Sequence, residues 1–396
     1  MKRIAIIGMG LGADTVTPEA REAVERAGAL IGAPRMLEYY RDTNKPSYPY
    51  YLSKDIAALI ASENAETFAV LVSGDVGFYS AASGLAEALA EYELRFIPGI
   101  STVNAFFARL KLPWQDAAFI SAHGRQTDIA GAVRRNRLTF CLTGNNISEL
   151  GTALDAAGFG RVKTYVGENL GTETERVYET SAEDLMKAEY PPLTVLLFVN
   201  DAFNDGTPAG LPDDSFARVT GIPMTKSETR AVVLSKLRLR PADICWDVGA
   251  GTGSVTVEMA LNAYRGHVYA VERREGAMPL IGQNCKSFHL GNVTCVCGEA
   301  PGALEQLPAP DAVFIGGSGG EIDGIVFSVL RKNPEARIVV TAVTPETVSS
   351  ALTAFADAGL APEIVQLNVA RGKRAGGLHL MEARNPVTIL SAGGKS

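Results

Sequence analysis

Residues 244–255 read Ile-Cys-Trp-Asp-Val-Gly-Ala-Gly-Thr-Gly-Ser-Val, and this stretch decides the fold of the second half of the chain. Its first five residues are apolar except for Asp247, which is typical of a buried strand. Glycines at alternate positions allow a tight loop that a ligand can approach closely. The apolar pattern after them predicts a helix, whose N-terminus favours a polar or anionic group. The stretch therefore predicts a strand–loop–helix unit that binds a nucleotide.

The next predicted strand, His267–Val271, supports this interpretation because an acid, Glu272, follows it. An acidic side chain about twenty residues beyond such a loop is where α/β folds hold ribose hydroxyls. Ser254 stands where the dinucleotide fingerprint has its third glycine or alanine. No pyrophosphate needs to be held if the cofactor is S-adenosylmethionine (SAM). The alternative is a glycine-rich turn without a ligand.

Length and composition limit the classes of protein to which the whole chain can belong. The chain has 396 residues, 46% hydrophobic and 20% charged, which indicates a globular protein of two or three domains. The net charge of −7 comes without a basic stripe, so we expect no nucleic acid partner. No run of 18 apolar residues predicts a transmembrane helix, and we expect a cytoplasmic protein. The five cysteines and four histidines show no metal-ligand spacing, so we expect no metal.

Further apolar runs define the domain organisation. Strands separated by helices predict α/β domains with largely parallel sheets covered on both faces. Gly, Pro and Asp residues are concentrated between the two halves. They predict a linker at 208–222 between a first domain at 1–207 and a second at 223–396. The predicted strands lie at 4–7, 68–72, 95–97, 117–120, 138–142, 163–166 and 194–199, then at 243–248, 267–271, 293–297, 312–315 and 337–341.

The motifs of the second half resemble a known family. Asp247–Gly253 with Glu272 resembles motifs I and II of the Rossmann-like class I SAM methyltransferases. Residues 223–228, 298–301, 314–320 and 385–387 resemble the C15-methylating, decarboxylating branch of cobalamin biosynthesis. The resemblance implies a SAM pocket lined by Thr225, Gly249, Ala250, Gly251, Thr252, Gly253, Glu272 and Ala300. It also implies that Gly316, Gly317, Ser318, Gly319 and Gly320 lie near the substrate.

The first half resembles the tetrapyrrole methylase family, in its C5-methylating precorrin branch. Residues 73–76, 98–102, 121–125 and 166–171 carry this resemblance. It implies a tetrapyrrole-methylase fold of two α/β lobes with SAM between them. It places Gly74, Asp75, Val76, Ser101, Thr102 and Leu142 near SAM, and the loop with Gly8, Gly10 and Gly12 at the substrate.

An alternative interpretation of the first half is an NAD site. Gly8-Met-Gly10-Leu-Gly12-Ala13 matches the dinucleotide fingerprint after a strand. The next helix, however, is predicted to begin only at Pro18, with Thr17 as its N-cap. The following apolar segment ends in Gly32 instead of an acid that could bind ribose. Both observations argue against NAD.

Individual polar residues suggest further roles. His123, Arg125 and Glu168 are candidates for catalysis, although a loop histidine, a surface arginine and a structural carboxylate are equally open. An acidic protein that binds a polycarboxylate needs local cations. Two candidates are Lys226 and Arg230, beside the Thr225 motif. The others are Arg371, Lys373 and Arg374, in an expected glycine-bearing loop near the end of the chain.

Together, the two halves resemble the family of precorrin-6Y C5,15-methyltransferases (decarboxylating). This resemblance implies methylation of precorrin-6Y/6B at C5 and C15 with loss of the ring C acetate carboxyl, giving precorrin-8X. It implies one SAM site per domain. The alternatives are another tetrapyrrole SAM methyltransferase, a two-domain NAD-dependent oxidoreductase, or a non-catalytic sensor of SAM or tetrapyrrole. We also expect a homo-oligomer that does not bind membranes.

Overall fold

The computed structural model describes residues 1–123 and 127–394, which form two compact units. The first unit holds most of residues 1–200. The second holds residues 201–394 together with 128–136 and 150–161. No helix among the described residues is long and apolar enough to cross a membrane.

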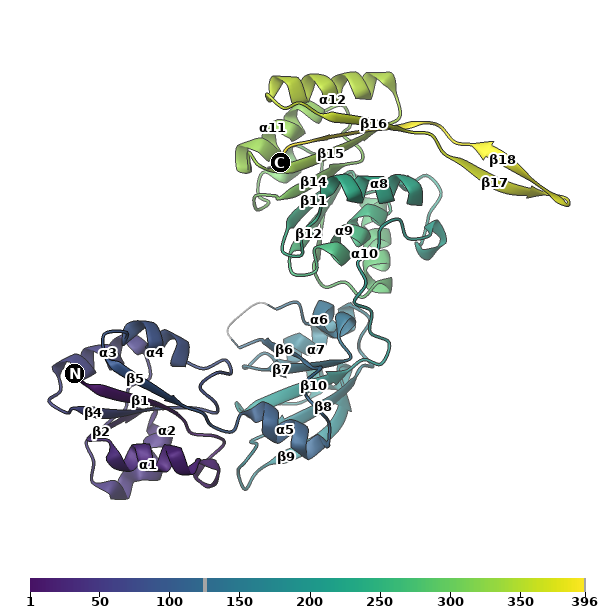
Figure 1. Ribbon diagram of the computed structural model, residues 1–396. Coiled ribbons are helices and arrows are strands. Elements are labelled where there is room, and N and C mark those ends of the chain that lie inside the picture. The colour runs from purple at the N-terminus through teal and green to yellow at the C-terminus, as the bar shows by residue number, and fades with distance from the viewer. Residues whose placement is uncertain (124–126, 395–396) are drawn as a thin grey trace. The chain divides into compact units, whose positions relative to one another are not determined.

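The first lobe of the first unit is a parallel sheet with the strand order β3-β2-β4-β1-β5 (Figure 1). Side chains alternate between the faces of a strand. Ile4 and Ile6 of β1 therefore pack with α3 and α4, whereas Ile7 packs with α1 and α2. The predicted N-cap of α1 is confirmed, since Thr17 accepts the Ala20 N–H. The elements are β1 (Arg3–Gly8), α1 (Pro18–Arg26), β2 (Ala29–Gly32), α2 (Pro34–Leu37), β3 (Ser47–Tyr48), α3 (Ser53–Ser62), β4 (Thr67–Val72), α4 (Ala82–Ala88) and β5 (Glu93–Ile97).

The second lobe has a mixed sheet with the order β6-β7-β10-β8-β9. Only β6 and β7 are parallel, so the expectation of a largely parallel sheet is wrong here. For β8 and β9 the physical reason is their short connection, because parallel neighbours need a crossover of a dozen or more residues. Its elements are α5 (Thr102–Leu110), β6 (Ala118–Ser121), β7 (Leu138–Leu142), β8 (Lys163–Glu168), β9 (Arg176–Ser181) and β10 (Thr194–Val199). Between these strands the chain also forms α6 (Ile129–Arg135) and α7 (Ile147–Ala156), and α6 and most of α7 group with the second unit.

The second unit contains a seven-stranded sheet with the order β13-β12-β11-β14-β15-β19-β16. The first five strands are parallel, and β19 runs antiparallel to both of its neighbours. The strands that the sequence predicts in this half are confirmed to within one residue. They are β11 (Ile244–Val248), β12 (His267–Glu272), β13 (Val293–Cys297), β14 (Ala312–Ile315) and β15 (Arg337–Ala342), joined by β16 (Glu363–Leu367) and β19 (Val387–Ala392).

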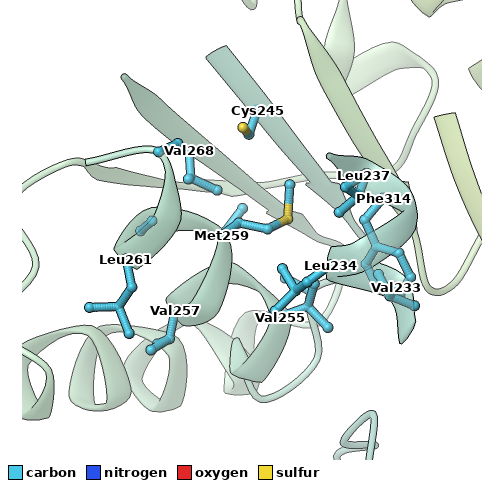
Figure 2. Close-up of a cluster of buried hydrophobic side chains, with 14 of the residues drawn as sticks. Val233, Leu234, Leu237, Cys245, Val255, Val257, Met259, Leu261, Val268 and Phe314 are labelled. Atoms are coloured by element: carbon cyan, nitrogen blue, oxygen red, sulfur yellow. The ribbon is translucent and has the colours of Figure 1, made fainter. Parts of the chain in front are cut away.

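Helices cover both faces of this sheet, which gives three layers. Cys245 of β11 packs with α8, α9 and α10, whereas its neighbour Trp246 packs with α11 and α12 on the other face. Figure 2 shows the first of these cores, with Met259 of α9 lying between its helix and the strands. The helices are α8 (Ser227–Leu237), α9 (Ser254–Asn262), α10 (Met278–Ser287), α11 (Ile322–Lys332) and α12 (Pro345–Asp357).

The segment 208–222, predicted as a linker, is packed against the second unit over much of its length. The N–H groups of Gly210 and Leu211 donate to the Glu258 carboxylate at 2.6 and 3.0 Å. Phe216 is buried in the core beside α8. Residues 210–216 are therefore part of this fold, because a buried carboxylate and a core side chain hold them there.

A two-stranded hairpin extends from the second unit between β16 and β19 (Figure 1). Its strands are β17 (Ala370–Ala375) and β18 (Leu378–Ala383). The expectation of a loop around Arg371, Lys373 and Arg374 is therefore wrong. Gly376, with a φ of 63°, belongs to the two-residue turn that allows the strands to pair.

Candidate active sites

The glycine loop after β11 packs closely against the loop after β14. Gly249 has a φ of 79°, which favours glycine. A Cβ atom at Gly249 would lie 2.6 Å from the backbone N and O of Gly317. Any larger residue would push the two loops apart. The Gly-x-Gly-x-Gly pattern and the Gly-Gly-Ser-Gly-Gly pattern therefore meet as one cradle of bare backbone.

Glu272 closes this cradle from the end of β12. Its Oε2 accepts the Gly251 N–H at 2.9 Å, and its Oε1 accepts the Arg274 N–H at 3.0 Å. A carboxylate has about four acceptor sites, so two remain for hydroxyl groups of a ligand. The Glu272 carboxylate can therefore accept hydrogen bonds from the ribose hydroxyls of a nucleoside such as that of SAM, and the adjacent glycines leave room for it.

A cavity of about 160 Å³ lies in this cradle. Most of the predicted SAM residues line it, namely Thr225, Gly249, Ala250, Gly251, Glu272 and Ala300. Thr252 and Gly253 are not among the lining residues. Thr252 is buried, and Gly253 packs against Ile281 as the N-cap of α9. Their contact with SAM stays a prediction, and the structure places both at the start of α9, beside the cavity residues.

Asp247 also lies behind the cradle and is fully buried. Its Oδ2 accepts the hydroxyl of Thr256 at 2.5 Å, and so ties β11 to α9. Burial raises the pKa of this carboxyl to about 7. Asp247 of the sequence motif therefore stabilises the glycine loop through its hydrogen bond to α9.

A larger cavity of about 640 Å³ adjoins the first. The two share the loop Gly316–Gly319 together with Pro223 and Thr225. Gly316, Gly317, Ser318, Gly319 and Gly320 all line the larger cavity, as do apolar residues of β14–β16. Ligands in the two cavities would therefore both contact this loop and lie next to each other.

The predicted substrate cations have different positions. Lys226 and Arg371 line the larger cavity. Arg371 is paired: its Nε and Nη2 donate to Glu228 at 2.7 and 2.6 Å. Arg230 is a correction, because it is completely buried and bonds to Glu258 at 2.7 Å and Asp213 at 3.1 Å. Lys373 is a second correction, since it lies on the exposed part of the hairpin, 3.6 Å from the Glu382 carboxylate, and does not line the cavity.

The pair between Arg371 and Glu228 predicts a pH dependence. Arg371 lowers the pKa of Glu228 to about 2, against about 4.3 for a free glutamate. A lowered pKa stabilises the fold above pH 4.3, and this contribution is lost as the pH falls towards 2. The stability difference between wild type and Glu228→Gln should therefore be constant above about pH 5 and shrink below it. Denaturant titrations at each pH measure this. Glu382→Gln is the control: its partner Lys373 is exposed, and a similar trend there would contradict the assignment.

The first unit contains a cavity of about 580 Å³ lined by both of its lobes. The predicted residues Gly10, Gly12, Gly74, Asp75, Ser101, Thr102 and Leu142 line it. The backbones of Gly10 and Gly74 bond to each other at 3.0 and 3.1 Å. Asp75 accepts the N–H groups of Gly77 and Gly99 at 2.8 and 3.1 Å, which joins two of the loops.

Two of the predicted residues in this unit lie outside the cavity lining. Val76 packs against the core of the first lobe. Gly8 lies where three loops meet, since a Cβ atom there would be 2.7 Å from Gly74 O and Gly99 N. Their predicted places near SAM and the substrate stay predictions, and what the structure shows is that both residues pack beneath the loops that line the cavity.

The three catalytic candidates, His123, Arg125 and Glu168, differ in their positions relative to this cavity. His123 is exposed and lines the cavity. Arg125 lies outside the described residues. Glu168 is buried and accepts the Tyr178 hydroxyl at 2.8 Å. Burial, and after it this hydrogen bond, raises the pKa of Tyr178. Glu168 does not line the cavity, so its structural interpretation is the one the contacts support.

Sequence reasoning missed several cavity residues. Arg35 and Tyr39 line the cavity of the first unit, and Arg384 lines the larger cavity of the second. A signal for Arg384 exists: Gly376-Gly377 between two short strands is a hairpin turn, and pairing outward from it brings residue 384 opposite Val369.

The NAD alternative finds no support, because α1 begins at Pro18 and the Gly8–Gly12 loop does not form its N-terminus. Among the described residues, no group of three potential ligands could hold a metal ion.

Comparisons with known proteins cover both halves. Residues 3–186 match the family described as tetrapyrrole (corrin/porphyrin) methylases, and residues 216–393 match the precorrin methyltransferase domain. A precorrin-6Y C(5,15)-methyltransferase [decarboxylating] from Sinorhizobium sp is 31% identical, over 97% of this chain and 95% of that protein.

Other relatives match the second half alone. A probable cobalt-precorrin-6B C(15)-methyltransferase (decarboxylating) from Pyrobaculum calidifontis is 44% identical over 46% of this chain and 95% of its own length. A solved structure of a precorrin-6Y C5,15-methyltransferase from Geobacter metallireducens is 41% identical, covers 47% of this chain and 96% of its own, and has a TM-score of 0.44.

Proposed function

The chain belongs to the family of precorrin-6Y C(5,15)-methyltransferases (decarboxylating), and from this premise we propose how its two domains divide the work. It is a SAM-dependent enzyme of cobalamin biosynthesis that methylates a precorrin and decarboxylates it. We assign C15 methylation and decarboxylation to the second domain, residues 223–396, and C5 methylation to the first, residues 1–207. Each domain would then bind its own SAM.

The observation that carries this proposal is the shared wall of the two cavities in the second unit. SAM supplies an electrophilic methyl group on a sulfonium, whose leaving group needs no acid. The protein must then align donor and acceptor and exclude water. The backbone of Gly249–Gly251 and the Glu272 carboxylate hold the donor side, and the loop Gly316–Gly319 presents it to the larger cavity.

The larger cavity also suits decarboxylation. Its wall includes Ile315, Val340, Leu367 and Val387, and these side chains offer no hydrogen bonds to a carboxylate. A carboxylate held against them loses hydration, which favours its departure as neutral carbon dioxide. The conjugated macrocycle accepts the electron pair that is left behind.

Mass spectrometry of the product tests the proposal. The full chain with precorrin-6Y and methyl-labelled SAM should give a product with two labelled methyl groups and one carbon dioxide fewer. A product with one methyl group, or with its acetate intact, would contradict it. SAM should raise the thermal stability of the protein, whereas NAD should not. Stabilisation by NAD alone would favour the oxidoreductase alternative.

Three finer points complete the proposal. We propose two SAM molecules bound per chain, which titration calorimetry of the full chain tests. We also propose a homo-oligomer, which its mass in solution tests. The third point is that the enzyme acts in the cytoplasm without a metal, so that full activity should survive treatment with a chelator.

A further inference from the structure

Four charged side chains line the larger cavity of the second unit: Lys226, Glu228, Arg371 and Arg384. Two of them neutralise each other, since Arg371 and Glu228 form a bidentate pair. Arg371 also donates to Ser227 at 2.9 Å and to Asp213 at 3.3 Å. A substrate carboxylate could bind Arg371 only by displacing these partners.

Arg384 is different, because its guanidinium has no carboxylate partner anywhere in residues 1–123 and 127–394. Lys226 is only loosely paired, 4.0 Å from Asp213, with its side chain 40% exposed. The cavity therefore has two cations whose charge is largely available, Lys226 and Arg384, and only Lys226 was among the cations expected from the sequence.

The ladder of the hairpin explains why Arg384 lies at the cavity. Ala370 pairs with Ala383 and Arg371 with Glu382. The N–H of Arg384 donates to the Val369 carbonyl at 2.8 Å, which continues this ladder by one pair. Since side chains alternate along a strand, Val369, Arg371 and Arg384 lie on one face of the hairpin root. All three line the cavity.

We propose that Arg384 binds a peripheral carboxylate of the tetrapyrrole in the second domain, with Lys226 as a weaker second cation. This rests on the proposed function of that domain. A guanidinium presents paired N–H groups that match a carboxylate, and charge-assisted hydrogen bonds of this kind are the strong ones. The apolar wall lacks such a cation, so the anchored carboxylate and the departing one are held in different surroundings.

Steady-state C15 methylation by the full chain tests the assignment. Arg384→Gln should raise the KM for the precorrin by about tenfold or more, because a hydrogen bond to a charged group is lost. The kcat should change little, since Arg384 is an anchor and not a reacting group. Arg384→Lys should recover part of the loss. Raising the salt concentration should increase the wild-type KM more steeply than that of Arg384→Gln.

Two matched controls come from the same hairpin. Lys373 lies two residues further out on the same face as Arg371, paired with Glu382, and Arg374 lies on the opposite face. Lys373→Gln and Arg374→Gln should leave the KM unchanged. An unchanged KM in Arg384→Gln, or an equal rise in the two controls, would overturn the proposal.

The outcome separates this inference from the function on which it rests. If wild type itself forms no C15-methylated product, the proposed function fails. If wild type is active and Arg384→Gln behaves like wild type, only the role of Arg384 fails. Calorimetric titration with SAM should give the same affinity for wild type and Arg384→Gln, because Arg384 lines the larger cavity and not the smaller one, where SAM is proposed to bind. A loss of SAM affinity in the variant would also overturn the assignment.

Discussion

Gly251→Arg is expected to abolish C15 methylation and decarboxylation while C5 methylation continues. Gly251 has a φ of 57°, and a Cβ atom there would lie 2.6 Å from the Pro223 carbonyl oxygen. The new side chain would also break the contact between the Gly251 N–H and Glu272. Because misplacement of about 1 Å costs about 100-fold in rate, the loss should be at least that large. Product analysis should show a singly methylated tetrapyrrole that keeps its carboxyl group.

A reciprocal variant and a control make this result interpretable. Gly74 has a φ of 65° and lines the cavity of the first unit, so Gly74→Arg should remove C5 methylation alone. Gly276→Arg makes the same chemical change at an exposed position of the second unit, with no atom within 4 Å of the added Cβ. It should leave both activities intact. Loss of both activities in Gly251→Arg, with the protein still folded, would refute independent sites.

Arg230→Met is expected to destabilise the second unit by about 3–5 kcal/mol. Arg230 and Glu258 are both completely buried and 2.7 Å apart. Removing one partner leaves a buried charge, which costs far more than breaking an exposed pair. Glu258 also holds Gly210 and Leu211, so the segment before α8 should loosen as well. Chemical denaturation of the full chain measures the loss.

The double variant Arg230→Met/Glu258→Gln identifies the cause. It removes both charges, so it should be less destabilised than the sum of the two single variants. Lys373→Gln, which breaks an exposed pair in the same unit, should leave stability unchanged. Wild-type stability in Arg230→Met would show that the guanidinium is solvated in solution.

Much of the fold was predictable because buried parallel strands leave a strong pattern. Ile4–Ile7 and Phe68–Val72 are continuous apolar runs, and the structure contains both as central strands. The two strands of the hairpin, which the sequence missed, lack this signal. Ala370–Ala375 and Leu378–Ala383 are exposed on nearly all of their residues, so no burial pattern marks them. β9 is likewise only partly buried and joins its sheet through antiparallel pairing.

The candidate sites were predictable where chemistry depends on local backbone. A glycine loop followed about twenty residues later by Glu272 places backbone and acid at adjacent strand ends, and the structure joins them by a 2.9 Å hydrogen bond. Loop residues that support a site from behind were harder to separate from those that line it. Thr252 is buried and Val76 packs against the core of the first lobe, and neither lines a cavity.

The sequence by itself determined the class of the two domains, the glycine cradles and the family, because these depend on neighbouring residues and on motif spacing. Only the tertiary structure decided which cations are available to a substrate. Arg230 and Arg371 are neutralised by Glu258 and Glu228, which lie 28 and 143 residues away along the chain. Arg384 remains unpaired among the described residues. The charge of a side chain is a property of its residue type, but its freedom to bind depends on which opposite charges the fold brings within reach.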